Sequence, residues 1–449
     1  MRQFSLNPID RATLVSFDGG IAQPVLYQRP DRYRLIQSDL SRRPRIVRGG
    51  GYSYAAASFG AGSVVQDVRR FNRLLRFDPT ARIVEVEAAV TLADLLTITS
   101  RAGLCLPVQP GYPAITIGGC IAANVHGKNP SREGTFAGSL IDLTLFHPDH
   151  GVVRVSRENS RGLFDLTCGG YGLTGVILAA TLRLEPLAGD RVSIRRTRVA
   201  NPLEAVAVAR DLAGDSLFAY TWHDAAPRAR SFGRGFVYHG ILKSGPIEAA
   251  NVVPRYRVLT SAARARLPFS LWQPLTIRAF TSAFWHAEAS RPEVTESTLF
   301  DAIFPFARRS VYFRLFGRPG LAEYQALIPH DGTETFLHEL RHLILSTSAP
   351  AIMLSVKAFK GAQRLLRFDG DGICVTLDLQ RSATTLDLLR QIDNLTIAVG
   401  GIPNIIKDSR LPKPVVQACY PEYERFRQEL CAFDPQRVFK SELSERLAL

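Results

Sequence analysis

The side chains best suited to chemistry lie at the end of the run 110–128, where His126 supplies an imidazole and Lys128 an ammonium group. The run before them is poor in large side chains. It begins with a rigid turn that holds two prolines, then passes through Gly118-Gly119 into small residues. Each glycine in place of alanine costs roughly 0.5–1 kcal/mol of stability through backbone entropy. Such runs are therefore usually found where a turn needs positive φ or where a ligand approaches the backbone closely. Alone, the run fits either a structural turn or a ligand surface.

Three further segments point to a bound ligand. The chain 44–48 reads as a short strand leading to a triple-glycine turn at 49–51, which can form a nest of N–H donors for a diphosphate. A second glycine-rich turn covers 169–175, and a polar tail covers 404–410 and is followed by 433–439. The first turn lacks the strand–GxGxxG–helix context of a Rossmann fold, and the sequence has no Walker-A lysine.

Together and in this order, the segments resemble the FAD-linked oxidases of the vanillyl-alcohol oxidase type, which carry a PCMH-type FAD-binding domain. The resemblance covers nearly the whole chain and is strongest over 44–186 and 400–449. Two motifs, His126-Gly-Lys-Asn129 and Lys407-Asp-Ser-Arg410, match one subgroup in particular. That subgroup is the decaprenylphosphoryl-β-D-ribose 2′-oxidases, the flavoprotein half of an epimerase in the synthesis of a lipid-linked arabinose donor for the cell envelope.

The resemblance implies an α+β fold with two domains. Residues 1–188 are expected to form the N-terminal part of the FAD-binding domain, and 189–398 a substrate-binding domain with an antiparallel sheet flanked by helices. Residues 399–449 are expected to return to the FAD-binding domain. The order of strands and helices after residue 320 independently favours an antiparallel sheet with helices on one face.

The resemblance also implies FAD, held against the three glycine-rich segments and the tail. The residues expected to bind FAD are Arg48, Gly49, Gly50, Gly51, Tyr52, Ser53, Tyr54, Pro110, Gly111, Tyr112, Gly118, Gly119, Ala122, Ala123, Val125, His126, Gly172, Gly175, Ile177, Asn404 and Lys407.

Lys407 and His126 are the expected catalytic residues. The match of Lys407 in the family lies beside the flavin pyrimidine edge and the substrate hydroxyl, where a cation stabilises the reduced flavin. Partial burial is expected to lower the pKa of Lys407, so that it helps accept a proton. Five residues are expected to line the substrate pocket: Lys128, Trp222, Gln325, Lys357 and Cys374, the last as a wall and not as a nucleophile. No metal ligands are expected.

Two departures from the family pattern affect the cofactor and the substrate. Many members bind FAD covalently through a histidine just after the glycine turn, but this chain has Tyr52 there. Non-covalent FAD is therefore expected. Where the subgroup has Tyr-His-Pro in the substrate pocket, this chain has Ile303-Phe304-Pro305, which leaves the identity of the sugar open.

The composition is that of a globular protein. The 449 residues are 46% hydrophobic and 21% charged, enough for two domains with substantial cores. The sequence contains no run of 18 apolar residues and no recognisable signal peptide. Its six cysteines are scattered without metal-site spacing, as in reduced, mostly buried thiols of a cytoplasmic protein.

The net charge of +14 suggests an anionic partner. No nucleic-acid-binding module is recognisable, so nucleic acid is not expected. An anionic membrane or a phosphorylated lipid fits better, and an ordinary solvated surface is the alternative. The segment 245–300 looks least regular and holds aromatic residues between arginines. It is either part of the core or a membrane-facing lip, with Arg264–Trp285 as the contact.

Periodicity predicts several elements. Strands are expected at 83–87, 141–146, 152–155, 178–184, 324–328, 352–357 and 374–379, and an edge strand at 191–198. Helices are expected at 92–102, with Thr91 as its N-cap and Gly103 at its end, and at 201–212, 334–345 and 385–399.

The function that fits these features best is FAD-dependent oxidation of a sugar hydroxyl, specifically the 2′-hydroxyl of a polyprenylphosphoryl-β-D-ribose, to a keto sugar. A short-chain NAD(P)H-dependent reductase would then complete the epimerisation. The expected location is the cytoplasm, with peripheral binding to the inner face of the membrane. The alternatives are an alditol or aldonolactone oxidase of the same superfamily and a catalytically inactive flavin-binding protein.

Overall fold

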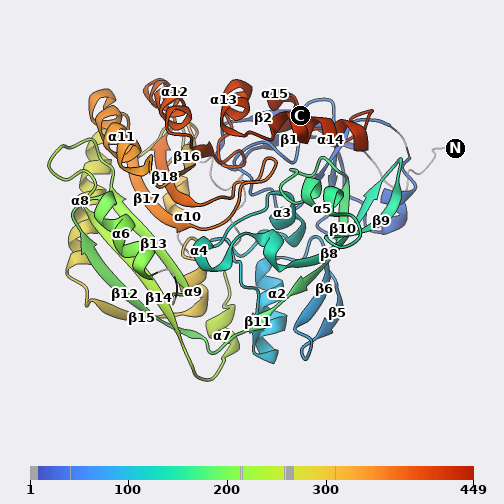
Figure 1. Ribbon diagram of the computed structural model, residues 1–449, viewed down its shortest axis with the longest axis horizontal. Coiled ribbons are helices and arrows are strands. Elements are labelled where there is room, and N and C mark those ends of the chain that lie inside the picture. The colour runs from blue at the N-terminus through green and yellow to red at the C-terminus, as the bar shows by residue number, and fades with distance from the viewer. Residues whose placement is uncertain are drawn as a thin grey trace.

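The computed structural model describes residues 9–40, 42–212, 214, 216–256, 258, 267–308 and 310–449. Two smaller sheets and one large sheet form its framework (Figure 1). Strand β3 is part of the first small sheet and ends at the triple-glycine turn. The first sheet has the order β1 (Asp10–Val15), β2 (Ala22–Gln28), β4 (Val64–Asp67) and β3 (Arg45–Arg48). It is antiparallel at β1–β2 and parallel elsewhere.

The second small sheet is antiparallel throughout, and in it the predicted strands 141–146 and 152–155 pair as a hairpin. Its order is β5 (Leu74–Asp78), β6 (Ile83–Glu87), β10 (Val176–Arg183), β8 (Leu140–His147) and β9 (Gly151–Ser156). Strands β7 (Leu104–Cys105) and β11 (Glu185–Pro186) form a separate short antiparallel pair. The helical segments of this region are α1 (Tyr33–Gln37), α2 (Leu92–Thr99), η1 (Ser100–Ala102), α3 (Ile117–Ala122), α4 (Pro130–Glu133), η2 (Phe136–Ser139) and α5 (Arg161–Thr167).

The helix predicted over 92–102 is confirmed at its start, whereas α2 ends at Thr99 and the 3-10 turn η1 continues to Ala102. The Thr91 side chain accepts from the Asp94 N–H and the Asp94 side chain accepts from the Thr91 N–H, which completes a capping box. Gly103 follows η1 with φ 66°, a left-handed conformation that glycine adopts without strain. The buried face of α2 packs in the core that also contains the second small sheet.

The large sheet has eight antiparallel strands, ordered β15 (Val294–Thr298), β12 (Arg191–Val199), β14 (Gly235–Lys243), β13 (Phe218–Asp224), β17 (Ala351–Phe359), β18 (Gly372–Gln380), β16 (Leu321–Ile328) and β19 (Ile402–Pro403). The prediction that 191–198 is an edge strand is wrong. Strand β15 pairs with β12 over five residues and covers it. The sequence between them is about a hundred residues long, so local periodicity could not reveal this pairing.

Helices flank the large sheet, as predicted, but they lie on both of its faces and not on one alone. Helices α6 (Pro202–Leu212), α11 (Thr333–Thr347) and α12 (Ala383–Ala398) share an apolar core with its strands. Helix α8 (Pro274–Ala289) packs near Trp222 on the other face, with the rings of Trp222 and Phe284 4.5 Å apart. The remaining helices are α7 (Ala249–Val252), α9 (Leu299–Ile303), α10 (Ser310–Arg314), α13 (Lys413–Cys419), α14 (Tyr423–Phe433) and α15 (Glu442–Leu447).

The C-terminal helices α13, α14 and α15 pack against the first small sheet. Residues from Leu411 to Leu449 share one apolar core with Val25, Ile46 and Val65 of β2, β3 and β4. In Figure 1 these red helices lie beside the blue strands β1 and β2. The chain therefore ends next to the sheet from which it started. The domain boundaries at residues 188 and 398 stay a prediction.

The segment 245–300 is more regular than the sequence suggested. It contains α7, α8, β15 and the start of α9. Trp272 is only 2% exposed and packs against Phe280 and Tyr312, so it belongs to the core and cannot be a membrane contact. Residues 264–266 of the predicted lip lie outside the described residues. Within the described part, no helix is both long and apolar enough to cross a bilayer.

Candidate active site

The triple-glycine turn packs directly against the start of α3, and this contact leaves no room for side chains. A Cβ atom at Gly49 would lie 2.4 Å from Thr116 Oγ1, and one at Gly50 would lie 2.9 Å from the carbonyl oxygen of Ala114. Gly51 has φ +73°, which favours glycine. Two glycine-rich segments that are 60 residues apart in the sequence thus form one surface of bare backbone.

The second glycine-rich turn joins the other end of α3. The Tyr171 N–H donates to the carbonyl of Ala122 at 2.8 Å, and Gly169 donates to Ile121 at 3.0 Å. Gly172 and Gly175 have φ of +80° and +136°. All three glycine-rich segments predicted to hold FAD therefore converge on one short helix.

Arg48 supplies a cation beside this backbone. Its Nη1 donates to Ser58 Oγ at 2.8 Å, and its guanidinium lies 5.8 Å from the ring centre of Phe59. Burial lowers the pKa of this arginine. No carboxylate of the described chain forms an ion pair with it, whereas most buried cations are paired. A partly buried arginine next to a tight glycine turn fits the diphosphate of FAD.

The face of the large sheet opposite α11 and α12 is polar where β16, β17 and β18 run side by side. Glu323 lies opposite Asp378, and Gln325 opposite Thr376. Lys357 on β17 lies opposite Cys374 on β18. Alternate residues of the same strands belong to the apolar core on the far side. The period of two thus gathers charged and polar side chains on one face.

The C-terminal tail brings Lys407 to this polar face. Asn404 N–H donates to the Gln325 carbonyl at 2.7 Å, which fixes the tail beside β16. The Lys407 ammonium then lies 3.0 Å from Glu323 Oε1 and 4.1 Å from the ring centre of Tyr54. Tyr54 follows the triple-glycine turn, so Lys407 lies where the predicted cofactor surface and the polar face of the sheet meet.

His126 joins the same group of side chains. Its Nδ1 lies 2.9 Å from the Gly127 carbonyl oxygen and its Nε2 lies 3.4 Å from Gln325 Oε1. Burial, with a smaller effect of Lys357, lowers the pKa of His126 to about 3. The ring is therefore neutral near pH 7. Both ring nitrogens lie beside a carbonyl oxygen, so the single N–H of the neutral ring donates either to the Gly127 carbonyl or to Gln325 Oε1.

Two predicted pocket residues have other surroundings. The Lys128 ammonium donates to the Ala302 carbonyl and lies 5.5 Å from the ring centre of Phe218. Trp222 is 7% exposed and packs against Phe284. Their roles in substrate binding stay predictions. By contrast, Gln325, Lys357 and Cys374 share the polar face with Lys407.

Three polar residues of this face were missed by the sequence analysis: Glu323, Asp378 and Tyr312. The Tyr312 hydroxyl donates to Asp378 Oδ2 at 2.6 Å from the short helix α10. A signal did exist for Asp378, which alternates with apolar residues in the predicted strand 374–379. Glu323 lies one residue before the predicted strand 324–328 and was therefore not considered. A charged residue on a buried sheet face is a candidate for function.

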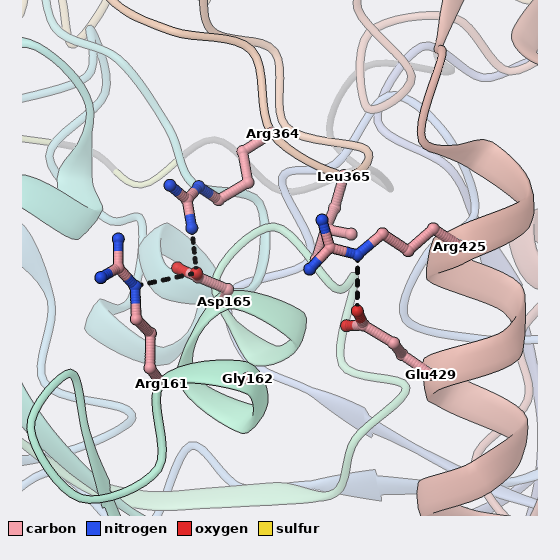
Figure 2. Close-up of a pocket in the computed structure, with 7 residues that line it drawn as sticks. All are labelled: Arg161, Gly162, Asp165, Arg364, Leu365, Arg425 and Glu429. Atoms are coloured by element: carbon pink, nitrogen blue, oxygen red, sulfur yellow. Dashed lines mark hydrogen bonds and ion pairs between the residues drawn. The ribbon is translucent and has the colours of Figure 1, made fainter.

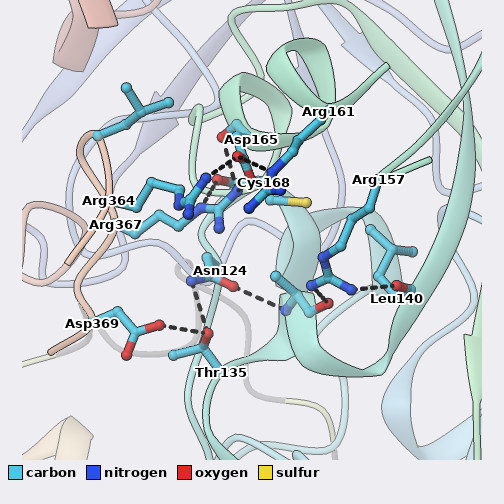
Figure 3. Close-up of polar contacts among 12 residues, drawn as sticks. Asn124, Thr135, Leu140, Arg157, Arg161, Asp165, Cys168, Arg364, Arg367 and Asp369 are labelled. Atoms are coloured by element: carbon cyan, nitrogen blue, oxygen red, sulfur yellow. Dashed lines mark hydrogen bonds and ion pairs between the residues drawn. The ribbon is translucent and has the colours of Figure 1, made fainter. Parts of the chain in front are cut away.

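The loop between β17 and β18 fastens the large sheet to the glycine-rich region (Figure 3). Arg367 donates to the Cys168 carbonyl at 2.8 Å and pairs with Asp165 of α5 at 2.9 Å. Asp369 accepts from Thr135, which in turn accepts from the Asn124 amide. Asn124 is two residues from His126, so this loop supports the turn that carries the imidazole.

A surface pocket lies beside this loop (Figure 2). Arg161 and Arg364 point toward Asp165 and pair with it. Arg425 pairs with Glu422 and Glu429. The three arginines of this pocket are therefore already paired with carboxylates, and none of the residues that line the pocket belongs to the candidate active site.

Comparison with known proteins agrees with this geometry. Residues 38–156, which contain the triple-glycine turn and α3, match the family described as FAD binding domain. The chain is 26% identical over 424 residues to the decaprenylphosphoryl-β-D-ribose oxidase of Mycolicibacterium smegmatis, covering 90% of this chain and 89% of that protein. It is 30% identical over 373 residues to an uncharacterized protein of Streptomyces coelicolor, covering 80% and 100%.

The chain belongs to the FAD-linked oxidases with a PCMH-type FAD-binding domain. The L-gulonolactone oxidase of Bos taurus is also similar, at 22% identity over 447 residues, which is 94% of this chain and 95% of that protein. The protein is therefore an FAD-dependent oxidoreductase that acts on CH–OH groups. When bound, FAD supplies the acceptor for the carbinol hydride.

Proposed function

We propose that this FAD-linked oxidase converts the 2′-hydroxyl of a polyprenylphosphoryl-β-D-ribose, or a closely similar lipid-linked pentose, to a ketone. The observation that carries the proposal is the position of Lys407, between Tyr54 of the glycine turn and Glu323 of the polar sheet face. Full-length similarity to the M. smegmatis decaprenylphosphoryl-β-D-ribose oxidase supports the substrate class.

The residues divide into two groups with different tasks. Arg48 and the bare backbone at Gly49–Gly51 and Gly118–Gly119 hold the cofactor diphosphate. Lys407, His126 and Gln325 orient the carbinol, and burial keeps the His126 ring neutral. The Lys407 ammonium also favours negative charge on the reduced ring, because a fixed cation in a site with little water is poorly screened.

The remaining finer features of the proposal concern partners. The keto sugar would be reduced by a separate NAD(P)H-dependent short-chain enzyme to complete the epimerisation. The lipid substrate would be taken from an anionic membrane face, which the charge of +14 favours. The chain has Tyr52 where many relatives have the histidine that bonds to FAD, so we propose that FAD is bound non-covalently. It has Phe304 where the subgroup has a pocket histidine, so we propose that the wall facing the sugar is altered.

A second candidate function is oxidation of a free aldonolactone or alditol, because the L-gulonolactone oxidase of Bos taurus matches over nearly the full length of both chains. Anaerobic bleaching of the flavin absorbance separates the two. Polyprenylphosphoryl ribose should bleach the flavin, and L-gulono-1,4-lactone and xylitol should not. Bleaching by the free compounds alone would replace the first function by the second. No bleaching by any of them, with dithionite still effective, would favour a flavin-binding protein without this activity.

A further inference from the structure

Two buried carboxyl groups face each other in the polar wall of the site. Glu323 on β16 lies directly opposite Asp378 on β18, and the two residues are 7% and 4% exposed. Like charges at directly opposed positions of neighbouring strands destabilise a sheet. Such a pair therefore favours a state in which one of the two carboxyl groups holds a proton.

The groups around the pair differ on its two sides. Glu323 Oε1 forms an ion pair with the Lys407 ammonium at 3.0 Å. Asp378 Oδ2 accepts a hydrogen bond from the Tyr312 hydroxyl at 2.6 Å. Asp378 Oδ1 is buried and has no hydrogen-bond partner among the described residues. An oxygen left without a donor is more costly when charged than when protonated. The geometry thus places the proton on Asp378 and the negative charge on Glu323.

Other titratable groups face the pair from neighbouring elements. Lys357 comes from β17, and burial followed by the charge of Lys407 lowers its pKa. Burial raises the pKa of Cys374 on β18 to about 11 and that of Tyr312 well above its usual value, so both stay neutral. Burial and the charge of Glu323 raise the pKa of Asp378 to about 7, against the opposing effects of Tyr312 and Lys407.

We propose that Glu323 and Asp378 form one proton-accepting pair that stores the proton of the substrate hydroxyl behind Lys407. This inference rests on the proposed function. The substrate O–H bond breaks and its proton goes to the Lys407 nitrogen as an ammonium proton passes to Glu323. FAD, when bound, would supply the acceptor for the hydride that leaves with the electron pair of the C–H bond. The pair changes from one proton to two. Asp378 never contacts substrate, so it is a positioning residue that acts through Glu323.

The pH dependence of flavin reduction is the first test. In the wild-type protein, loss of the Asp378 proton makes the pair a stronger base than it is with one proton, so the rate of flavin reduction should rise with pH through one inflection near 7. Asp378→Asn removes the titrating group but keeps an acceptor for Tyr312, so the inflection should disappear with only about a two- to fivefold loss of rate. Tyr312→Phe should move the inflection upward, because its hydrogen bond lowers the pKa of Asp378. Glu323→Gln should slow reduction at least about tenfold.

A second measurement requires no substrate. Infrared difference spectra of the holoenzyme, oxidised against dithionite-reduced, should show a carboxylic-acid carbonyl band that shifts in D₂O. The band should be absent in Asp378→Asn and present in the control Asp142→Asn, whose carboxylate pairs with Arg154 on the second small sheet. An inflection that persists in Asp378→Asn, or a band that does, would overturn the inference. If no sugar bleaches the flavin but the band behaves as expected, only the proposed function fails.

Discussion

At the scale of single residues, Lys407 has the most direct role. Lys407→Ala should keep the fold and much of the FAD, because the Lys407 ammonium contacts the side chains of Glu323 and Tyr54 and not the backbone of Gly49–Gly51. Flavin reduction should slow at least about 100-fold, the usual effect of removing one preorganised electrostatic group. Stopped-flow reduction measures this. Lys360→Ala, an exposed lysine, is the control. Similar rates in the two variants would exclude Lys407 from the mechanism.

Tyr52 determines a second residue-scale prediction. Its ring centre lies 4.8 Å from that of Tyr112 in a tilted arrangement and 5.7 Å from that of Phe17 in an edge-on arrangement. A phenol there cannot make the histidyl bond to FAD that is found in many relatives. Acid or heat should therefore release all the FAD into the supernatant, as read by its absorbance. Yellow colour that remains with the precipitated polypeptide would mean that another side chain binds it covalently.

The neutral state of His126 predicts how stability depends on pH. The unfolded chain protonates this histidine below its ordinary pKa of 6.5, but the folded protein does so only near 3. Because the unfolded state binds more protons in that window, the free energy of unfolding falls as pH decreases from 6.5 toward 3. His126→Gln should reduce this fall, measured by urea unfolding at about pH 7 and about pH 4.5. The exposed His338→Gln should leave it unchanged.

At the scale of elements, the sequence predicted what depends on local pattern. Thr91 as an N-cap predicted where α2 begins, and alternation predicted β16, β17 and β18. Gln325 was predicted as a site residue through the family resemblance. Contacts set by distant pairing were missed, because nothing near Asp378 in the sequence indicates that Tyr312 will reach it or that Glu323 will lie opposite.

The loop between β17 and β18 carries the element-scale prediction. The side chains of Arg367 and Asp165 are 9% and 13% exposed, and removing one partner of a buried pair costs about 3 kcal/mol or more. Arg367→Ala should lower the free energy of unfolding by about that amount. Arg364→Ala removes a partner of the same Asp165, but Arg364 is 43% exposed, so its loss should cost about 0–1 kcal/mol. Urea titrations measure both free energies of unfolding. Equal losses in Arg367→Ala and Arg364→Ala would contradict the prediction that the buried pair contributes more than the exposed one.

At the scale of the whole molecule, the candidate site exists only because three regions of the chain meet. The glycine turn comes from the first small sheet, the polar face from the large sheet, and Lys407 from the C-terminal tail. The order of the motifs predicted that these regions belong together through a family resemblance. It did not predict that β15 closes the sheet edge or that Trp272 is core, since both depend on the packing of the complete chain.

The outer surface near the site carries a group of exposed apolar side chains that fits a membrane contact. Leu275 on α8 is 77% exposed, Val311 on α10 is 61% exposed, and Phe269, which precedes α8, is 58% exposed. A hydrogen bond from the Leu271 N–H to the Leu315 carbonyl holds the segment before α8 against the residue that follows α10. Val311 precedes Tyr312, whose hydroxyl reaches Asp378, so this apolar patch lies close to the polar wall.

We therefore expect reversible binding to anionic vesicles. Attraction of about 1 kcal/mol per nearby Lys or Arg, with a few inserted side chains, gives binding that salt weakens. The triple variant Phe269→Ser, Leu275→Ser, Val311→Ser should float less with phosphatidylserine vesicles at low salt. The control variant Val152→Ser, Ile241→Ser changes exposed apolar residues on β9 and β14, which are 51% and 48% exposed. It should float like the wild type. Trp272 is left intact because it is core. If the triple variant and the control float equally, the patch makes no membrane contact.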